Sequence, residues 1–210
     1  TASGELPENL KSGDKYDGFI VGEVFKNRYR RVLKTGELDN TTRAAKVRSG
    51  IIGYSDRNPR IPYCRTTAFT QKYWNYNKCI PYIKLVDDFF KEYEPRRYKA
   101  QKYYADATPQ DFVIHGTSFT TVTVNQNFRT AAHYDAGDLK EGFGNLGALT
   151  RGEYDGGTTV IPKYGIGLDM REGDISIFDV HELHGNTEIK RKGFYERITI
   201  VCYYRKKMIY

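Results

Sequence analysis

The residues whose types and spacing most clearly suit metal binding are a histidine and an aspartate two positions apart, His133 and Asp135. They follow a run rich in β-branched residues at 119–124, which is typical of a strand. Side chains two residues apart in an extended chain point to the same side. We therefore expect this imidazole and this carboxylate to converge on one cation.

A third ligand is available in His184, 49 residues after Asp135 and just beyond a second strand-like run at 174–178. Two histidines and one carboxylate form the facial triad that leaves positions open on Fe(II). His181 is an alternative ligand. If both histidines lay in one strand, their three-residue spacing would turn the two rings to opposite faces, so only one could reach the metal.

The last strand-like run, 197–204, begins with Arg197 and has Thr199 two positions later. Period two again places both side chains on one face. A guanidinium fork beside a hydroxyl suits the far carboxylate of a bidentate 2-oxo acid. The order of H-x-D, a β stretch, His and then Arg-x-Thr therefore predicts a metal site beside an anchor for a 2-oxo acid.

The elements that position these residues are short β-branched runs separated by Gly, Asn and Asp turns. Their spacing of about 8–12 residues favours an antiparallel sandwich or jelly roll, and no helix-length pattern lies between them. The predicted strands are 119–124, 146–149, 158–161, 166–170, 174–178 and 197–204.

Helices are expected earlier in the chain. Tyr82, Leu85, Val86, Phe89, Phe90 and Tyr93 fall on one face of an α-helix. Pro81 suits its first turn and Pro95 its end, and a second short helix is predicted at 96–104. We therefore expect a mostly β single domain over 1–210, with a basic flank at 1–50, helical support at 51–111 and a double-stranded β-helix at 112–210.

The charge distribution points to an anionic partner. The chain has 210 residues and a formal net charge of +7. Residues 23–48 hold eight Lys and Arg against three acidic residues. This basic N-terminal strip is interpreted either as a solvated flank or as a surface for DNA phosphates.

Composition excludes other classes of protein. No apolar run approaches the ~20 residues of a membrane span. Three scattered cysteines, Cys64, Cys79 and Cys202, argue against a thiolate zinc site or a disulfide-linked partner. No charged-then-apolar leader opens the chain at Thr1. We expect an intracellular protein, nuclear or in the cytoplasm of a phage- or virus-infected cell, and not a secreted one.

Three segments carry a resemblance to a known family: FTTVTVNQNFRTAAHYDAGD, GEYDGGTTVIPKYGIGLDMREGDISIFDVHELHGNTEI and ERITIVCYYR. They resemble the oxygenase core of the TET and J-binding-protein group of Fe(II)/2-oxoglutarate dioxygenases, over roughly 112–206. The resemblance implies a double-stranded β-helix and hydroxylation of the 5-methyl of thymine or 5-methylcytosine in DNA.

The resemblance also implies roles for individual residues. The iron ligands would be His133, Asp135 and His184, and 2-oxoglutarate would be anchored by Arg197 with Thr199. Arg129 and Asn125 would lie near this co-substrate. Asp138 would bond a pyrimidine edge, and Tyr134 would either line the pocket or simply pack. O2 is the second co-substrate, and ascorbate is a candidate reductant.

Departures from the family leave the substrate open. The cysteine-rich region of the TET enzymes and the separate DNA-binding domain of the J-binding proteins have no counterpart here, so the chain is expected to be either a minimal oxygenase or a fragment. Two other hypotheses are a hydroxylase of protein side chains, prolyl or lysyl, and a non-catalytic jelly-roll binding module. Many prolyl hydroxylases carry a Lys about ten residues after the distal His, where this chain has Phe194.

Overall fold

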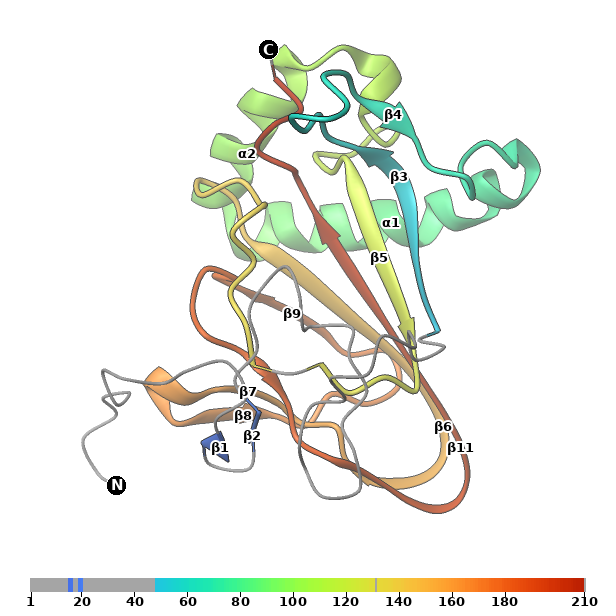
Figure 1. Ribbon diagram of the computed structural model, residues 1–210, viewed down its shortest axis with the longest axis vertical. Coiled ribbons are helices and arrows are strands. Elements are labelled where there is room, and N and C mark those ends of the chain that lie inside the picture. The colour runs from blue at the N-terminus through green and yellow to red at the C-terminus, as the bar shows by residue number, and fades with distance from the viewer. Residues whose placement is uncertain (1–14, 17–18, 21–47, 131, 210) are drawn as a thin grey trace.

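The computed structural model describes residues 15–16, 19–20, 48–130 and 132–209. The predicted basic strip therefore lies outside the described residues except for Arg48. Figure 1 shows the helices at one end of the molecule, near the C-terminus, and the short strands β7 and β8 toward the other end.

Antiparallel strands make up most of the fold. A six-stranded sheet has the order β4-β3-β5-β11-β6-β9, and a three-stranded sheet has the order β10-β7-β8. A separate two-stranded pair joins β1 and β2. The strands are β1 (Lys15–Tyr16), β2 (Phe19–Ile20), β3 (Ser49–Ser55), β4 (Arg65–Thr66), β5 (Thr121–Gln126), β6 (Gly144–Gly156), β7 (Thr159–Ile161), β8 (Ile166–Leu168), β9 (Ile175–Phe178), β10 (Gly185–Asn186) and β11 (Ile189–Tyr203).

The predicted strands are all present, but β6 and β11 are much longer than the sequence pattern suggests. They pair over most of their length, with a bulge between Arg191 and Tyr195. The strand β3 was not expected, because 51–111 was assigned to helical support. It pairs with β5 as part of the large sheet.

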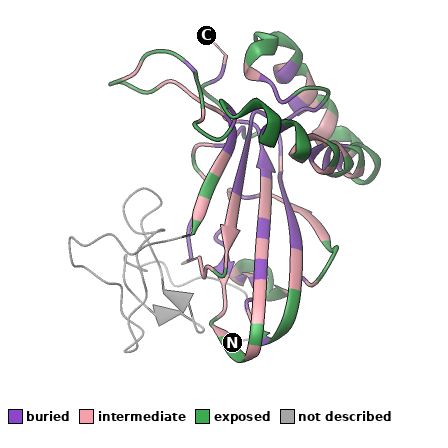
Figure 2. Ribbon diagram, turned by 90° about the vertical axis from the view of Figure 1, so that its right-hand side faces the viewer, coloured by how far each residue is buried: buried purple, intermediate pink, exposed green. Residues whose placement is uncertain are grey.

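The two faces of the large sheet have different partners. On β5 and β11, Val122 and Cys202 point toward the helices and join the main apolar core, whereas Thr123 and Val201 line a cavity on the other face. This alternation follows from the two-residue period of a strand. Figure 2 shows the outward sides of the helices exposed, with buried residues concentrated in the strands.

The helix α1 (Tyr73–Tyr93) covers the apolar face. It begins about two turns earlier than predicted, so Pro81 lies inside the helix and not in its first turn. Lys72 precedes it without a side-chain cap, which explains why no start signal marks residue 73. The buried face is also rotated relative to the prediction: Leu85 and Tyr93 are exposed, and the buried residues are Tyr76, Ile83, Val86, Asp87 and Phe90.

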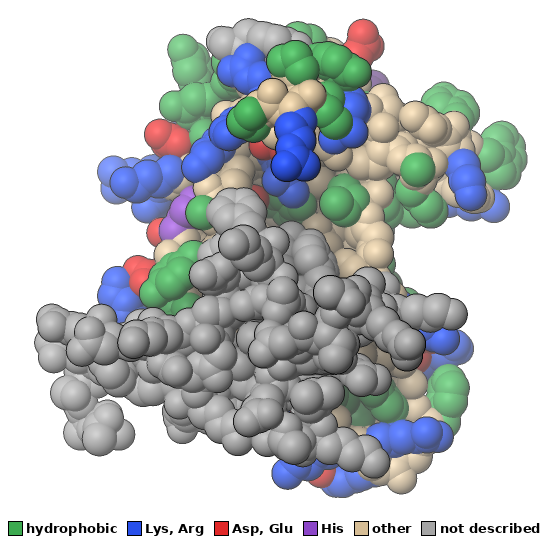
Figure 3. All heavy atoms as spheres, viewed as in Figure 1, with side chains coloured by type: hydrophobic (Ala, Val, Ile, Leu, Met, Phe, Trp, Pro, Cys, Tyr) green, Lys and Arg blue, Asp and Glu red, His purple; other side chains and the backbone are tan. Residues whose placement is uncertain are grey.

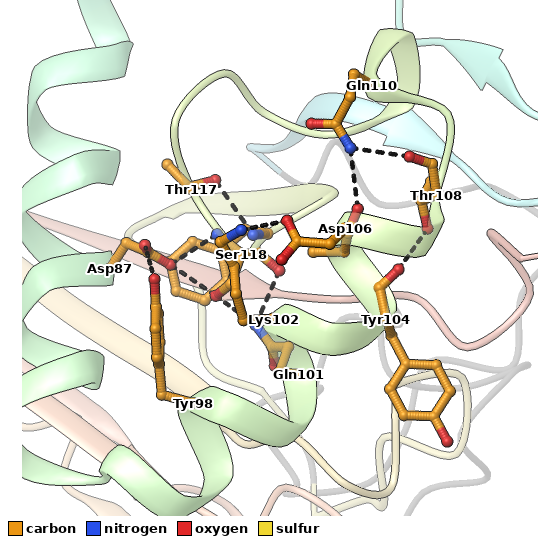
Figure 4. Close-up of polar contacts among 12 residues, drawn as sticks. Asp87, Tyr98, Gln101, Lys102, Tyr104, Asp106, Thr108, Gln110, Thr117 and Ser118 are labelled. Atoms are coloured by element: carbon orange, nitrogen blue, oxygen red, sulfur yellow. Dashed lines mark hydrogen bonds and ion pairs between the residues drawn. The ribbon is translucent and has the colours of Figure 1, made fainter.

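The second helix, α2 (Pro95–Ala107), confirms the short helix predicted there. A buried polar network ties it to α1 and to the loop before β5 (Figure 4). The carboxylate of Asp87 accepts hydrogen bonds from Ser118 N at 2.8 Å, Ser118 Oγ at 2.6 Å and the Tyr98 hydroxyl at 3.3 Å. Burial raises the pKa of Asp87 despite these donors. Two one-turn 3-10 segments, Gln110–Phe112 and Pro162–Tyr164, complete the described elements.

Two glycines of β6 are required by close packing on opposite faces of the sheet. A Cβ at Gly147 would lie 2.2 Å from the Tyr82 hydroxyl of α1. A Cβ at Gly144 would lie 2.1 Å from Val180 Cγ1, at the cavity. Both glycines are therefore explained by the packing of the strand.

No helix in the described part of the chain is long and apolar enough to cross a membrane. The three cysteines are free thiols.

Candidate metal and co-substrate site

Two segments far apart in sequence meet at the edge of the small sheet. His133 and His184 form an antiparallel bridge, with N–H···O distances of 2.9 and 3.1 Å between their backbones. The backbone N–H of Asp135 donates to the Val180 carbonyl at 3.0 Å. These bonds hold the H-x-D segment against the segment that carries the second histidine.

The side chains of His133, Asp135 and His184 converge. One ligand atom from each lies within 4.8 Å of the others. The carboxylate of Asp135 stands between the imidazoles, 3.5 Å from His133 Nε2 and 3.7 Å from His184 Nε2. This spacing and donor set fit a facial triad on a divalent transition metal.

The ring orientation of His184 is also suited to metal binding. Its Nδ1 lies 2.8 Å from the Glu182 carbonyl. A carbonyl can only accept, so Nδ1 carries the proton and Nε2 keeps its lone pair toward the triad. Phe178 packs edge-on against the same ring, with centroids 5.3 Å apart.

The triad lies in a cavity of about 300 Å³ between the two sheets. That volume is at the lower end of the usual range for ligand sites. Its lining combines apolar residues such as Leu146 and Phe178 with polar ones from both sheets, including Thr123, Thr159, Asn186 and Thr199.

The predicted anchor, Arg197, is buried with 2% exposure but does not itself line the cavity. One Nη donates to the Gly157 carbonyl at 2.9 Å, and Asn186, a lining residue, donates to that carbonyl at 3.3 Å. Burial lowers the pKa of Arg197, partly offset by Tyr154. Its Nε has no hydrogen-bond partner among the described residues. A buried guanidinium with an unused donor, joined to the lining residue Asn186 through the Gly157 carbonyl, fits an anionic ligand.

Three other predicted residues line the same cavity: Thr199, Asn125 and Asp138. Thr199 lies opposite Asn125 in the pairing of β5 with β11. Asn125 Oδ1 accepts a hydrogen bond from Ser49 Oγ at 2.7 Å. Asp138 is buried and lies three residues beyond Asp135.

Two predicted residues lie elsewhere. Arg129 does not line the cavity; its Nε donates to the Asn186 carbonyl at 3.1 Å, which braces β10 next to His184. Burial lowers the pKa of Arg129. Tyr134 is 44% exposed and is also absent from the lining, so it does not form the pocket wall. Both expectations rested on position in the sequence, which does not fix where a side chain points.

The alternative ligand His181 points away from the triad. Its Nδ1 lies 2.9 Å from the Asp179 carboxylate and its Nε2 lies 3.3 Å from the Asp138 carbonyl. It lies in a turn, not in a strand, so the strand argument for choosing between the two histidines does not apply. In the structure it is His184 whose ligand atom converges with those of His133 and Asp135.

Sequence reasoning missed Arg205, which lines the cavity beside Asp138. The two form an isolated β-bridge. The Arg205 guanidinium lies 3.5 Å from Asp56 and 3.5 Å from the Tyr203 hydroxyl. Burial lowers its pKa, but Tyr203, Asp56 and Asp138 outweigh that effect and raise it. The available signal was its even spacing, eight residues, from Arg197 on the same strand face.

A short basic segment at 190–192, which could also face a DNA backbone, is partly neutralised. Lys192 pairs with Asp155 at 2.8 Å, and Arg191 Nε donates to the Gly193 carbonyl at 2.8 Å.

Comparison with known proteins places this geometry in a family. Residues 50–206 match the Tet_JBP family model, described as the oxygenase domain of the 2OGFeDO superfamily. The match extends well before residue 112, where the resemblance in sequence was expected to begin.

Curated relatives agree. The chain is 40% identical over 164 residues to "Thymine dioxygenase JBP1-B" of Trypanosoma cruzi, covering 75% of this chain and 19% of that protein. It is 36% identical over 166 residues to "Bifunctional helicase and thymine dioxygenase JBP2" of the same organism, covering 77% and 15%. The chain thus spans less than a fifth of the length of these relatives.

Among solved structures, the fold is similar to that of "NgTET1 in complex with 5mC DNA". The TM-score is 0.59 at 14% identity, covering 78% of this chain and 62% of that one. The predicted jelly-roll fold is therefore confirmed. Because the family model matches residues 50–206, which are most of the chain, the chain belongs to the Tet_JBP family of 2-oxoglutarate- and Fe(II)-dependent oxygenase domains.

Proposed function

We propose that the chain is an Fe(II)/2-oxoglutarate-dependent dioxygenase that hydroxylates the 5-methyl group of a DNA pyrimidine, with thymine as the first candidate. The observation that carries the proposal is the convergence of His133, Asp135 and His184 in a cavity backed by the buried Arg197. The choice of thymine rests on the printed names of the curated relatives.

The chain's own residues would divide the work. The triad would hold Fe(II), while Arg197 and Thr199 would bind the far carboxylate of 2-oxoglutarate. When bound, the metal and this co-substrate supply the power to oxidise a C–H bond with O2. Fixed ligand orientation and exclusion of water are what the protein contributes.

The other end of the cavity would hold the base. Asp138 can accept a hydrogen bond from a pyrimidine N–H, and Arg205 beside it can donate to a ring carbonyl. A base paired in duplex DNA must leave the stack to reach such a cavity, which costs a few kcal/mol. DNA is accordingly the proposed partner, and a nuclear location, or one in an infected cell, follows from that proposal.

The test is incubation of the protein with Fe(II), 2-oxoglutarate, ascorbate and thymine- or 5-methylcytosine-containing DNA in air. Nucleosides are then analysed by mass spectrometry, and succinate is measured in parallel. We expect 5-hydroxymethyluracil from the thymine substrate, and none from the His133→Ala variant. Turnover on a peptide without any 5-hydroxymethyl nucleoside would favour the protein hydroxylase instead. Absence of both Fe(II) binding and succinate would favour the binding module.

A further inference from the structure

The chain makes a tight turn directly after β11 that has two lysines at its centre. Met208 N donates to the Arg205 carbonyl at 3.1 Å, which closes a four-residue turn around Lys206 and Lys207. Glycine, proline, asparagine, aspartate and serine dominate such positions in most proteins. Two adjacent lysines in this place give the turn a concentrated positive charge.

The turn is held firmly on both sides. Tyr204 precedes it with 1% exposure, and Met208 closes it with 0% exposure. The Tyr204 hydroxyl lies 2.6 Å from Thr108 Oγ1, and Arg57 Nη2 donates to the Ile209 carbonyl at 2.6 Å. The two exposed lysines therefore start from a fixed backbone.

The turn lies against the wall of the cavity. Lys206 N donates to the Gly137 carbonyl at 3.2 Å, and its Nζ donates to the Ala136 carbonyl at 2.5 Å. Ala136 and Gly137 both line the cavity, and Arg205 lines it from within. Lys206 thus lies against the end of the cavity that contains Asp138, and Lys207 is the next residue of the same turn.

The positive charge of the turn is not cancelled locally. Within the described residues, neither Lys206 nor Lys207 has a carboxylate within 4.0 Å, whereas Lys192 and Lys163 each have one. The ammonium of Lys206 donates one of its three N–H groups to the Ala136 carbonyl, which leaves two for a ligand. Figure 3 shows Lys and Arg side chains gathered at the end of the molecule where the C-terminus lies.

From these observations we infer that Lys206 and Lys207 bind backbone phosphates of the DNA strand whose base enters the cavity. The inference rests on the proposed function. A base that leaves the stack stays attached to its two phosphates, so the backbone must pass the cavity mouth. Ammonium groups bind phosphate as point charges and need no fixed approach direction, which suits two side chains on a rigid turn.

The test compares the wild-type chain with the double variant Lys206→Gln/Lys207→Gln. Affinity for a thymine-containing duplex is measured by fluorescence anisotropy from 50 to 200 mM NaCl, with Fe(II) and 2-oxoglutarate present and O2 absent. Loss of two phosphate contacts should weaken binding about tenfold and reduce the slope of log K against log salt by about 1.8. DNA-independent succinate formation and the melting temperature should stay unchanged.

Two matched variants make the result specific. Lys91→Gln/Lys99→Gln removes the same charge from exposed positions on the helices, across the sheet from the cavity, and should leave the salt slope unchanged. Lys206→Arg/Lys207→Arg should keep wild-type affinity. The inference is overturned if the turn variant keeps its slope, or if the helix variant loses as much. A wild-type chain that turns over 2-oxoglutarate but binds no DNA removes this inference, while one with no turnover removes the proposed function itself.

Discussion

The two faces of the six-stranded sheet are made by the same strands but do different things. On β11, Ile200 and Cys202 pack under α1, while Thr199, Val201 and Tyr203 face the cavity. One face is apolar and closed by a helix, and the other is partly polar and open to ligands. The comparison teaches that residues that stabilise the core and residues that line the cavity can alternate along a single strand, because successive side chains point to opposite faces of the sheet.

The largest effect of a single substitution is expected on the cavity face. Asp135→Asn removes the charged oxygen that lies between the two imidazoles, so we expect at least a ~1000-fold loss of turnover, beyond the 10–100-fold cost of losing an outer partner. Anaerobic titration with Fe(II) should show the loss of binding. The melting temperature of the metal-free protein should stay within about 2 °C, as for the exposed control Asp88→Asn. Unchanged iron affinity would remove Asp135 from the ligand set.

On the helix face the opposite result is expected. Phe90 is fully buried and lies against Phe119 and Tyr98. Phe90→Ala should lower the free energy of unfolding by about 3–5 kcal/mol, measured by urea denaturation. The molecules that remain folded should keep their affinity for Fe(II). Leu85→Ala, on the exposed side of the same helix, should change stability by less than about 0.5 kcal/mol. A loss of iron affinity in Phe90→Ala would show that the two faces are coupled.

A smaller effect, on the binding of 2-oxoglutarate, is expected from substitution of Arg197. Arg197→Lys keeps the charge but loses the fork that can hold a carboxylate through two hydrogen bonds. We expect the KM for 2-oxoglutarate to rise about 10- to 100-fold, the equivalent of one or two charge-assisted bonds. Fe(II) affinity should not change. The exposed Arg191→Lys on the same strand is the matched control, and an unchanged KM in Arg197→Lys would exclude this residue as the anchor.

The smallest effect concerns pH on the helix side. Because burial raises the pKa of Asp87, its contribution to stability is present below the ordinary carboxyl pKa and is lost as pH rises through the raised value. Asp87→Asn has no such titration. The unfolding free energy of the variant, relative to wild type, should therefore increase from pH 4 to pH 7 in urea denaturation. If the difference in unfolding free energy between variant and wild type did not change with pH, the pKa of Asp87 would not be raised in the folded protein.

The parts of the fold and site that could be predicted were local. The H-x-D pair and the short β runs are read from spacings of two residues. The strands were therefore located correctly, and the three proposed metal ligands converge in the structure. The start of α1 could not be found, because it has no cap and depends on packing of Tyr76 into the core. The pairing of β3 with β5 joins residues 68 to 76 positions apart, and no local pattern encodes it.

Side-chain roles near turns were the least predictable. Arg129 and Tyr134 were assigned from their positions near the H-x-D pair, and Asn127, with a positive φ of 50°, lies between β5 and both residues. Arg205 could be assigned only once the cavity face of β11 was known. The domain division stays a prediction, as does the role of residues 23–48.

The continuity of β11 has a consequence for how this protein can vary. Arg197 and Arg205 are eight residues apart along one strand and its extension, a span of about 26 Å at 3.3 Å per residue. The strand therefore sets the distance between the proposed anchor of 2-oxoglutarate and the proposed DNA-facing end of the molecule. Inserting one residue would turn every later side chain to the wrong face of the sheet. Inserting two would restore the face but increase the distance between Arg197 and Arg205 by about 7 Å. Length changes should therefore be tolerated in the bulge between Arg191 and Tyr195, and hardly at all beyond it.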